Sequence, residues 1–235
     1  GVSFVNGIAA ENVVQGTLGD CFFLASLAAV ARADPAAILN ALVENPDGTY
    51  TVTLHGAGGR DVRVHLDAAL PATAAGDEPF GRSLTPGELW PALYEKAYAK
   101  LCGGYAVLNR GGLPDQALAA LTGVRAHYRT LSTLSANEAW AMVTGALAAR
   151  DPVVTSTPEA RTLRSRTGRA DMAGLIDDHT YAVLDASVAS GVRTLRLYSP
   201  LLPADVGGPP AEPRAIDIAF DDWKADFDEI VVGSP

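Results

Sequence analysis

The 235-residue sequence has few charged residues and no long apolar run, and each shortage excludes a class of protein. Charged residues make up 19% of the chain and hydrophobic residues 48%, so the chain can bury a core and is not intrinsically disordered. Acidic residues outnumber basic ones, for a net charge of −9, which repels phosphate backbones. We therefore expect no nucleic-acid partner.

Cysteine is also scarce. The two present, Cys21 and Cys102, do not make a disulfide framework, so a reactive free thiol is one interpretation. The apolar segment 21–31 is shorter than the roughly 18 residues that a membrane span needs. It lacks a basic leader, so it predicts a buried helix instead of a signal peptide. The chain begins at Gly1 without Met, and we expect it to be part of a longer polypeptide, either cytoplasmic or secreted.

Apolar periodicity predicts helices in the first part of the chain and strands in the second. Asp20 is a natural N-cap for the first helix. The fold class predicted is α+β, with a helical lobe at 1–135 packed on a β-rich lobe at 136–235 across a cleft. The predicted helices are 21–30, 36–43, 88–101, 114–121 and 135–149, with a last one through Phe220, Trp223, Phe227 and Ile230. The predicted strands are a hairpin at 50–66, then 153–154, 181–184, 194–197 and 216–219.

The segment 15–21 places Cys21 behind two glycines, at the start of a helix. Helix dipole and free amides at this end favour a thiolate, which is the nucleophilic form. Its own amide and the side chain of Gln15 are candidate donors to an oxyanion. The other interpretation is a small buried hydrophobic residue. A nucleophilic cysteine needs an imidazole, and His179 at the start of an apolar strand is better placed than the hairpin histidines, although a structural role also fits the pattern.

Several segments together resemble the calpain family of cysteine peptidases. The run QGTLGDCFF at 15–23 is similar to the family's Q-G-x-x-G-D-C motif followed by an aromatic residue. Further similar segments follow in the same order, at 67–71, 88–100, 111–123, 174–183 and 223–227. The resemblance implies a papain-like fold of two lobes, with Cys21 as nucleophile, His179 as base and Gln15 in the oxyanion hole. The pair would form a thiolate–imidazolium ion pair and cleave peptide bonds of protein or peptide substrates through an acyl-enzyme.

Ser199 departs from the family pattern, which has asparagine as the third catalytic group. A shorter hydroxyl can hold His179 directly or through a water, with a weakened or differently tuned activity. In another interpretation Ser199 is a turn residue before proline and a different group, such as Asp185, orients the histidine.

Calcium is the cofactor that the resemblance suggests, through Asn12 and Glu95 in the first lobe. Asn12 replaces an acidic residue and removes one charge, so we expect no cofactor to be required, although calcium binding stays open. Glu95 can equally be a surface charge on an amphipathic helix. In the second lobe Asp205 and Glu212 lie in the corresponding acidic region without a clear match.

Four arginines within 157–173 form a basic run. This run is either a solvated loop or a gate before His179, and it could also favour acidic substrates or be a site of self-cleavage. The first functional hypothesis is an endopeptidase, the second a pseudopeptidase that binds peptides without cutting, and the third an acyl-transfer enzyme. The alanine and glycine content suggests a bacterial relative of the calpains.

Overall fold

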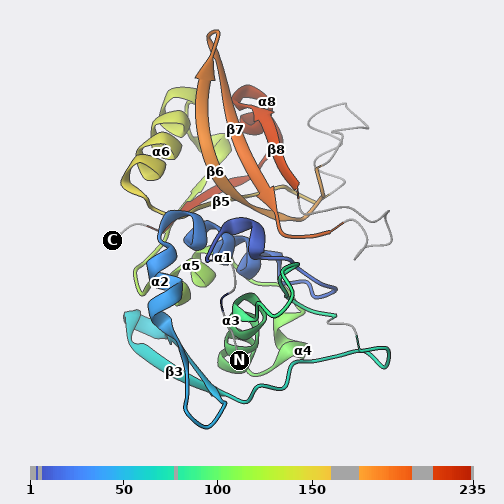
Figure 1. Cartoon of the computed structure of the whole chain (residues 1–235). Coiled ribbons are helices and arrows are strands. Elements are labelled where there is room, and N and C mark those ends of the chain that lie inside the picture. Colours follow the sequence, from blue (N-terminus) through green and yellow to red (C-terminus); the bar gives the residue numbers. More distant parts are fainter. Residues whose placement is uncertain (1–3, 5–6, 77–78, 160–174, 203–213, 234–235) are drawn as a thin grey trace.

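The structure is a computed structural model that describes residues 4, 7–76, 79–159, 175–202 and 214–233. Helices and a small sheet make up residues 7–126, here called the helical half. A larger sheet with the helices α6 and α8 makes up the described residues of 127–233, here called the sheet half. Figure 1 shows the sheet half above the helical half, with α1 at their junction.

The helical half is built around α1 (Cys21–Ala33), which is buried from Phe22 to Ala31. Such an all-round apolar helix is stable only inside a core. The other helices are α2 (Pro35–Ala41), α3 (Trp90–Cys102), α4 (Tyr105–Leu108), α5 (Pro114–Thr122) and the 3-10 turns η1 (Ala10–Asn12) and η2 (Ala57–Gly59). The antiparallel sheet comprises β1 (Leu42–Glu44), β2 (Tyr50–His55) and β3 (Asp61–Leu66).

The sheet half contains a six-stranded antiparallel sheet in the order β4-β9-β5-β6-β7-β8. Its strands are β4 (His127–Thr130), β5 (Val153–Ser156), β6 (Thr180–Ala189), β7 (Val192–Ser199), β8 (Arg214–Ala219) and β9 (Glu229–Val232). The helices are α6 (Ala136–Ala149) and α8 (Phe220–Asp226), with the 3-10 turn η3 (Leu131–Thr133). Ser190 and Gly191 both have positive φ and join β6 to β7, as a two-residue hairpin turn requires.

The two faces of the large sheet are buried against different partners. Alternate residues of β6 point to opposite faces, so Ala182 and Leu184 pack with α1 whereas Tyr181 and Val183 pack beneath α6 and α8. Burial on both faces explains why this strand reads as a continuous apolar run instead of an alternating one.

One prediction about the chain end is corrected by the structure. Ile230 does not continue the last helix, which stops at Asp226, but lies in β9. Strand β9 pairs with β4, which lies about a hundred residues earlier in the chain. Among the described helices none is by itself long and apolar enough to cross a membrane; α1 and α2 meet that criterion only as a pair bent by 111°.

Candidate active site

Cys21 is the first residue of α1, and two glycines allow the close packing of the loop before it. A Cβ added at Gly16 would fall well inside contact distance of the Pro79 carbonyl oxygen. At Gly19 it would lie 3.0 Å from the main-chain oxygen of Asn109, whose side chain accepts a 2.8 Å hydrogen bond from the Gly19 N–H. Close approach of neighbouring backbone therefore fixes the loop that presents Cys21.

Asp20 occupies the N-cap position of α1. Contrary to the prediction, its side chain makes no capping hydrogen bond to the helix. The carboxyl is fully buried and lies beside that of Glu95 on α3, which accepts a 2.8 Å hydrogen bond from the Gly81 N–H. Burial, and then the neighbouring carboxyl, raise the pKa of Asp20 well above its usual range. Burial raises the pKa of Glu95 to about 7. Burial of the two neighbouring carboxyl groups thus disfavours a state in which both are charged.

His179 is held at the start of β6 by main-chain and ring contacts. The Thr157 N–H donates to the His179 carbonyl at 2.9 Å, and the His179 N–H donates to Thr157 Oγ1 at 3.1 Å. Asp178 has a φ of 49°, a left-handed conformation that aspartate tolerates better than most residues. The imidazole packs edge-to-face on Tyr181, with ring centroids 4.8 Å apart. These contacts hold the imidazole ring independently of any hydrogen bond to its ring nitrogens.

Ser199 lies where it can orient the imidazole. Its Oγ is 3.0 Å from His179 Nε2, and both side chains are buried, with 4% and 3% of their surface exposed. Antiparallel pairing brings the end of β7 beside the start of β6. Ser199 Oγ also accepts a hydrogen bond from the Leu201 N–H at 3.3 Å. Asp185, the other candidate, is exposed on β6 beyond a bulge.

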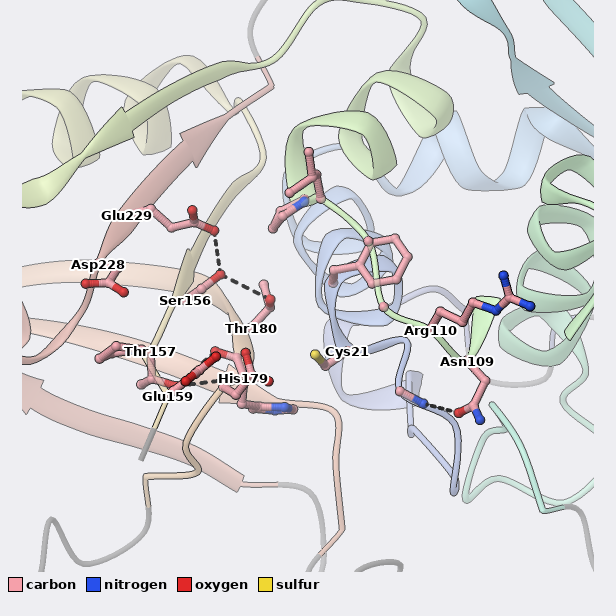
Figure 2. Close-up of a pocket in the computed structure, with 18 residues that line it drawn as sticks. Cys21, Asn109, Arg110, Ser156, Thr157, Glu159, His179, Thr180, Asp228 and Glu229 are labelled. Atoms are coloured by element: carbon pink, nitrogen blue, oxygen red, sulfur yellow. Dashed lines mark hydrogen bonds between the residues drawn. The ribbon is translucent and has the colours of Figure 1, made fainter. Parts of the chain in front are cut away.

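A cleft of about 480 Å³ separates the two halves, and both Cys21 and His179 line it. Figure 2 shows the Cys21 sulfur directed from the helical wall toward Thr180 and His179 on the sheet wall. Of the described lining residues, Arg110 is the charged side chain on the helical wall, and Glu159, Asp178, Asp228 and Glu229 are the carboxyl side chains on the sheet wall.

Burial acts on the ionisation of both Cys21 and His179. Burial raises the pKa of the Cys21 thiol, against the opposing effect of hydrogen bonds from Thr180. Burial lowers the pKa of His179 to about 3. In both groups burial disfavours the charged form, and the ion pair that the family resemblance implies stays a prediction.

Gln15, the predicted oxyanion donor, is not among the described residues that line the cleft. Its Nε2 donates a 2.6 Å hydrogen bond to the Leu18 carbonyl, while its Oε1 is buried without a partner in the described part of the chain. If the Gln15 amide were turned the other way, Oε1 would face the Leu18 carbonyl oxygen, and two acceptors repel each other. The Nε2 donor therefore points to the Leu18 carbonyl, within the loop that contains Gln15. The main-chain N–H of Gln15 donates to the Pro200 carbonyl at 2.7 Å, next to Ser199.

As arranged here, Asn12 and Glu95 do not fit a calcium ion. Asn12 Oδ1 accepts a 2.8 Å hydrogen bond from the Ala9 N–H, and Glu95 adjoins Asp20. Glu95 is 1% exposed, so its interpretation as a surface charge is wrong. No three His, Cys, Asp or Glu side chains within the described ranges gather as a metal site requires. Asp205, Glu212 and the arginine run at 161–169 lie outside the described residues.

Sequence reasoning missed several polar residues of the cleft, among them Asn109, Ser156, Thr180 and Glu229. Thr180 carried the best signal, because it directly follows the predicted base in an apolar strand. Ser156 and Glu229 end or begin short strands whose pairing the pattern does not reveal.

A free cysteine at a helix start and a buried, oriented histidine, facing one cleft, are what a thiol-dependent hydrolase requires. Residues 2–204 match the family model described as "Calpain family cysteine protease". The chain belongs to the calpain family of cysteine proteases, as the sequence motifs predicted, and this membership supports a cysteine protease function in general.

Relatives in plants and animals agree with that assignment. The chain is 29% identical over 197 residues to calpain-type cysteine protease DEK1 of Arabidopsis thaliana, which covers 81% of this chain and 9% of the relative. It is 29% identical over 210 residues to calpain-7 of Sus scrofa, and this match covers 82% of this chain and 25% of that relative. The chain therefore spans a quarter or less of these relatives, and in them the matching region is part of a longer polypeptide. They give no support to the expected bacterial origin.

Proposed function

We propose that the chain is a calpain-like cysteine endopeptidase, with Cys21 as nucleophile and His179 as general base. The observation that carries the proposal is the buried 3.0 Å contact of His179 Nε2 with Ser199 Oγ, on the cleft that also receives the Cys21 sulfur. A cysteine on the helical wall and a histidine on the sheet wall support a papain-like arrangement of two lobes. The cleft would receive extended, exposed segments of other proteins.

Proton transfer requires the tautomer in which Nε2 carries the hydrogen and donates it to Ser199 Oγ. Nδ1 is then the nitrogen that takes the Cys21 proton as the sulfur attacks the carbonyl carbon. Because burial raises the pKa of Cys21 and lowers that of His179, the proposal has this transfer accompany the attack. The carbon–nitrogen bond then breaks, the amine leaves with the proton from His179, and water hydrolyses the acyl-enzyme.

The developing oxyanion needs two donors. The Cys21 N–H is one, at the N-terminus of α1. The Gln15 side chain is the other only after it leaves the Leu18 carbonyl, to which it now donates at 2.6 Å. The proposal therefore includes a rearrangement of the Gln15 side chain when substrate binds.

The charge of the cleft favours basic substrate side chains. Among the described residues that line the cleft, four carboxyl side chains lie on the sheet wall and one arginine on the helical wall. Coulomb attraction in a partly enclosed cleft favours lysine or arginine over glutamate in the part of the substrate that lies along that wall.

A pseudopeptidase that binds peptides without cleaving them is the second candidate. The hydrogen bond that engages the Gln15 amide favours it, together with the burial that raises the pKa of Cys21 and lowers that of His179. Labelling of Cys21 by an epoxide thiol trap separates the two candidates, because a disarmed site would not react.

Hydrolysis of an unfolded protein substrate tests the proposal, with Cys21→Ala as the inactive variant. Cys102→Ser is the matched control, since Cys102 is exposed at the end of α3, away from the cleft. We expect the parent and Cys102→Ser to cleave and Cys21→Ala not to. If the parent neither cleaves nor labels at Cys21, the endopeptidase proposal fails.

The same assay, with and without added calcium, tests whether calcium is required. We propose that it is not, because Asn12 and Glu95 are engaged with protein groups. Activity that depends on added calcium would overturn this part of the proposal.

A further inference from the structure

Glu229 presents a carboxylate on a rigid strand of the cleft wall. It is the first residue of β9, whose neighbours in the sheet are β4 and β5. Its carbonyl accepts a 2.6 Å hydrogen bond from Thr155 Oγ1, which itself accepts one from Trp223 Nε1 at 3.0 Å. Because Trp223 is fully buried, these contacts tie the backbone of Glu229 to the core of the sheet half.

The side chain of Glu229 is oriented by a row of hydroxyl groups. Ser156 pairs with Glu229 on β9 and with Thr180 on β6, and directly paired residues of an antiparallel sheet share one face. Ser156 Oγ donates a 2.8 Å hydrogen bond to Glu229 Oε1 and lies 3.1 Å from Thr180 Oγ1, as Figure 2 shows. The Glu229 carboxylate thus has a defined place at the cleft.

This carboxylate keeps acceptor capacity for a ligand. A carboxylate has about four acceptor positions on its two oxygens, and Ser156 uses one of them on Oε1. Glu229 is half-buried, and none of the basic side chains that the structure describes forms an ion pair with it. Its negative charge is therefore available to a cation that enters the cleft.

The helical wall opposite offers an apolar surface. Phe22, Leu113 and Pro114 line the cleft there, and a Cβ added at Gly112 would overlap the Phe22 ring. Lysine and arginine combine an apolar stem with a charged end. One such side chain can therefore place its stem on the helical wall and its charge on the sheet wall.

The position of Glu229 limits which substrate residue it meets. Adjacent strands lie about 4.8 Å apart, so β9 lies about 10 Å from β6, which begins directly after His179. An extended substrate advances about 3.3 Å per residue, so the residue that meets Glu229 lies within about three positions of the scissile bond.

We propose that Glu229 is the specificity-determining residue of the cleft and binds a lysine or arginine side chain of the substrate. The cation pairs with the carboxylate while its stem lies on the apolar wall. Ser156 is a positioning residue, which holds the carboxylate in place. The inference rests on the proposed function and deepens it, since it assigns the selection to one of the four carboxyl groups.

The experiment measures cleavage of peptides in two stages. A synthetic peptide mixture with every position randomised is incubated with the parent protein, and mass spectrometry of the products gives the position at which lysine and arginine are enriched. Two peptides are then made that differ only at that position, with lysine or with norleucine, which has the same stem without the charge. We expect kcat/KM to be about tenfold higher for the lysine peptide, because a hydrogen bond to a charged partner is strong.

Charge substitutions in the cleft wall identify the residue responsible. Glu229→Gln keeps the shape and an oxygen for Ser156, so the ratio of the two peptides should fall about fivefold or more. Asp228→Asn removes a charge from the adjacent residue, and its effect should stay below about twofold. Asp221→Asn, at an exposed position of α8, makes the same change in net charge and should leave the ratio unchanged. Thermal unfolding of each variant shows that it folds.

Three results of the cleavage assay overturn the inference. The first is cleavage by the parent without enrichment of lysine or arginine near the scissile bond. The second is a lysine preference that survives Glu229→Gln. The third is an equal loss of preference in Asp228→Asn, since the charge of the whole wall would then act and not one residue. In each of these the parent still cleaves, so the proposed function stands while the inference fails.

If the parent cleaves no peptide, the proposed function fails, and binding tests the inference separately. Cys21→Ala is immobilised, the randomised mixture is passed over it, and the retained peptides are sequenced. We expect enrichment of lysine and arginine that is lost when Glu229→Gln is added to the same background. Retained peptides without this enrichment, or no retained peptide, overturn the inference.

Discussion

The helical half and the sheet half hold their reactive residues by different means. In the helical half, Cys21 is placed by backbone packing around Gly16 and Gly19, with a buried carboxyl pair behind the helix start. In the sheet half, His179 and Thr180 are held by hydroxyl groups on neighbouring strands. The first half therefore depends on shape and the second on hydrogen bonds.

This difference predicts which substitutions each half tolerates. A glycine against a neighbouring carbonyl leaves no room for a side chain, so we expect the Cys21 loop not to accept alanine at Gly16. A hydroxyl can replace an amide beside the imidazole, provided that the strand pairing brings it within reach, as Ser199 does at 3.0 Å. Substitutions in the two halves should accordingly fail in different ways, by loss of stability in one and by loss of rate in the other.

The largest expected loss of stability comes from Gly16→Ala. The added Cβ would overlap the Pro79 carbonyl, a backbone atom that cannot move like a flexible side chain. We expect a loss of about 3 kcal/mol in the free energy of unfolding, measured by denaturant titration. A loss below about 1 kcal/mol would mean that the loop has room to adapt, contrary to the shape dependence of this half.

Ser199→Ala should reduce kcat/KM with little loss of folding stability. Removing the hydroxyl frees the imidazole to rotate, and we expect about a hundredfold loss, less than for an anionic orienter. Ser199→Asn restores the residue of the family motif and should retain more activity than Ser199→Ala. Parental activity in Ser199→Ala would show that packing on Tyr181 alone orients the ring.

His179 should make the stability of the fold depend on pH. Its pKa in the folded protein, about 3, lies below its usual unfolded value near 6.5, so the folded state binds fewer protons. Its contribution is complete above about pH 6.5 and is lost as the pH falls toward 3. Between about pH 7.5 and 5 the parent should lose about 2 kcal/mol more than His179→Gln.

Denaturant titrations at the two pH values check this prediction. His65→Gln is the matched control, since His65 is exposed on β3 and should leave the pH dependence intact. Equal losses in the parent and in His179→Gln would mean that the imidazole is solvated in the folded protein.

The smallest effect expected is a gain from Gly145→Ala on α6. This glycine is exposed, has a negative φ, and an added Cβ would meet nothing within 4 Å. Alanine should therefore raise the free energy of unfolding by about 0.5–1 kcal/mol through its better helix propensity. A decrease in the free energy of unfolding of Gly145→Ala would indicate that another group lies close to Gly145. The contrast with Gly16 would then disappear.

The sequence by itself determined the family, the mixed helix and sheet composition, and the identity of the cysteine and histidine that meet at the cleft. These features follow from local sequence patterns. The motif around Cys21 depends on contacts of adjacent backbone, and a buried helix or strand is recognised by its run of apolar residues.

Only the tertiary structure decided what surrounds those residues. Ser156, Thr180 and Glu229 are far apart or unremarkable in the sequence, and become one row because β5 pairs with both β6 and β9. Asp20 faces Glu95 instead of capping its helix because α3 packs behind the loop. Strand order and side-chain protonation depend on residues brought together from distant parts of the chain, which no local pattern records.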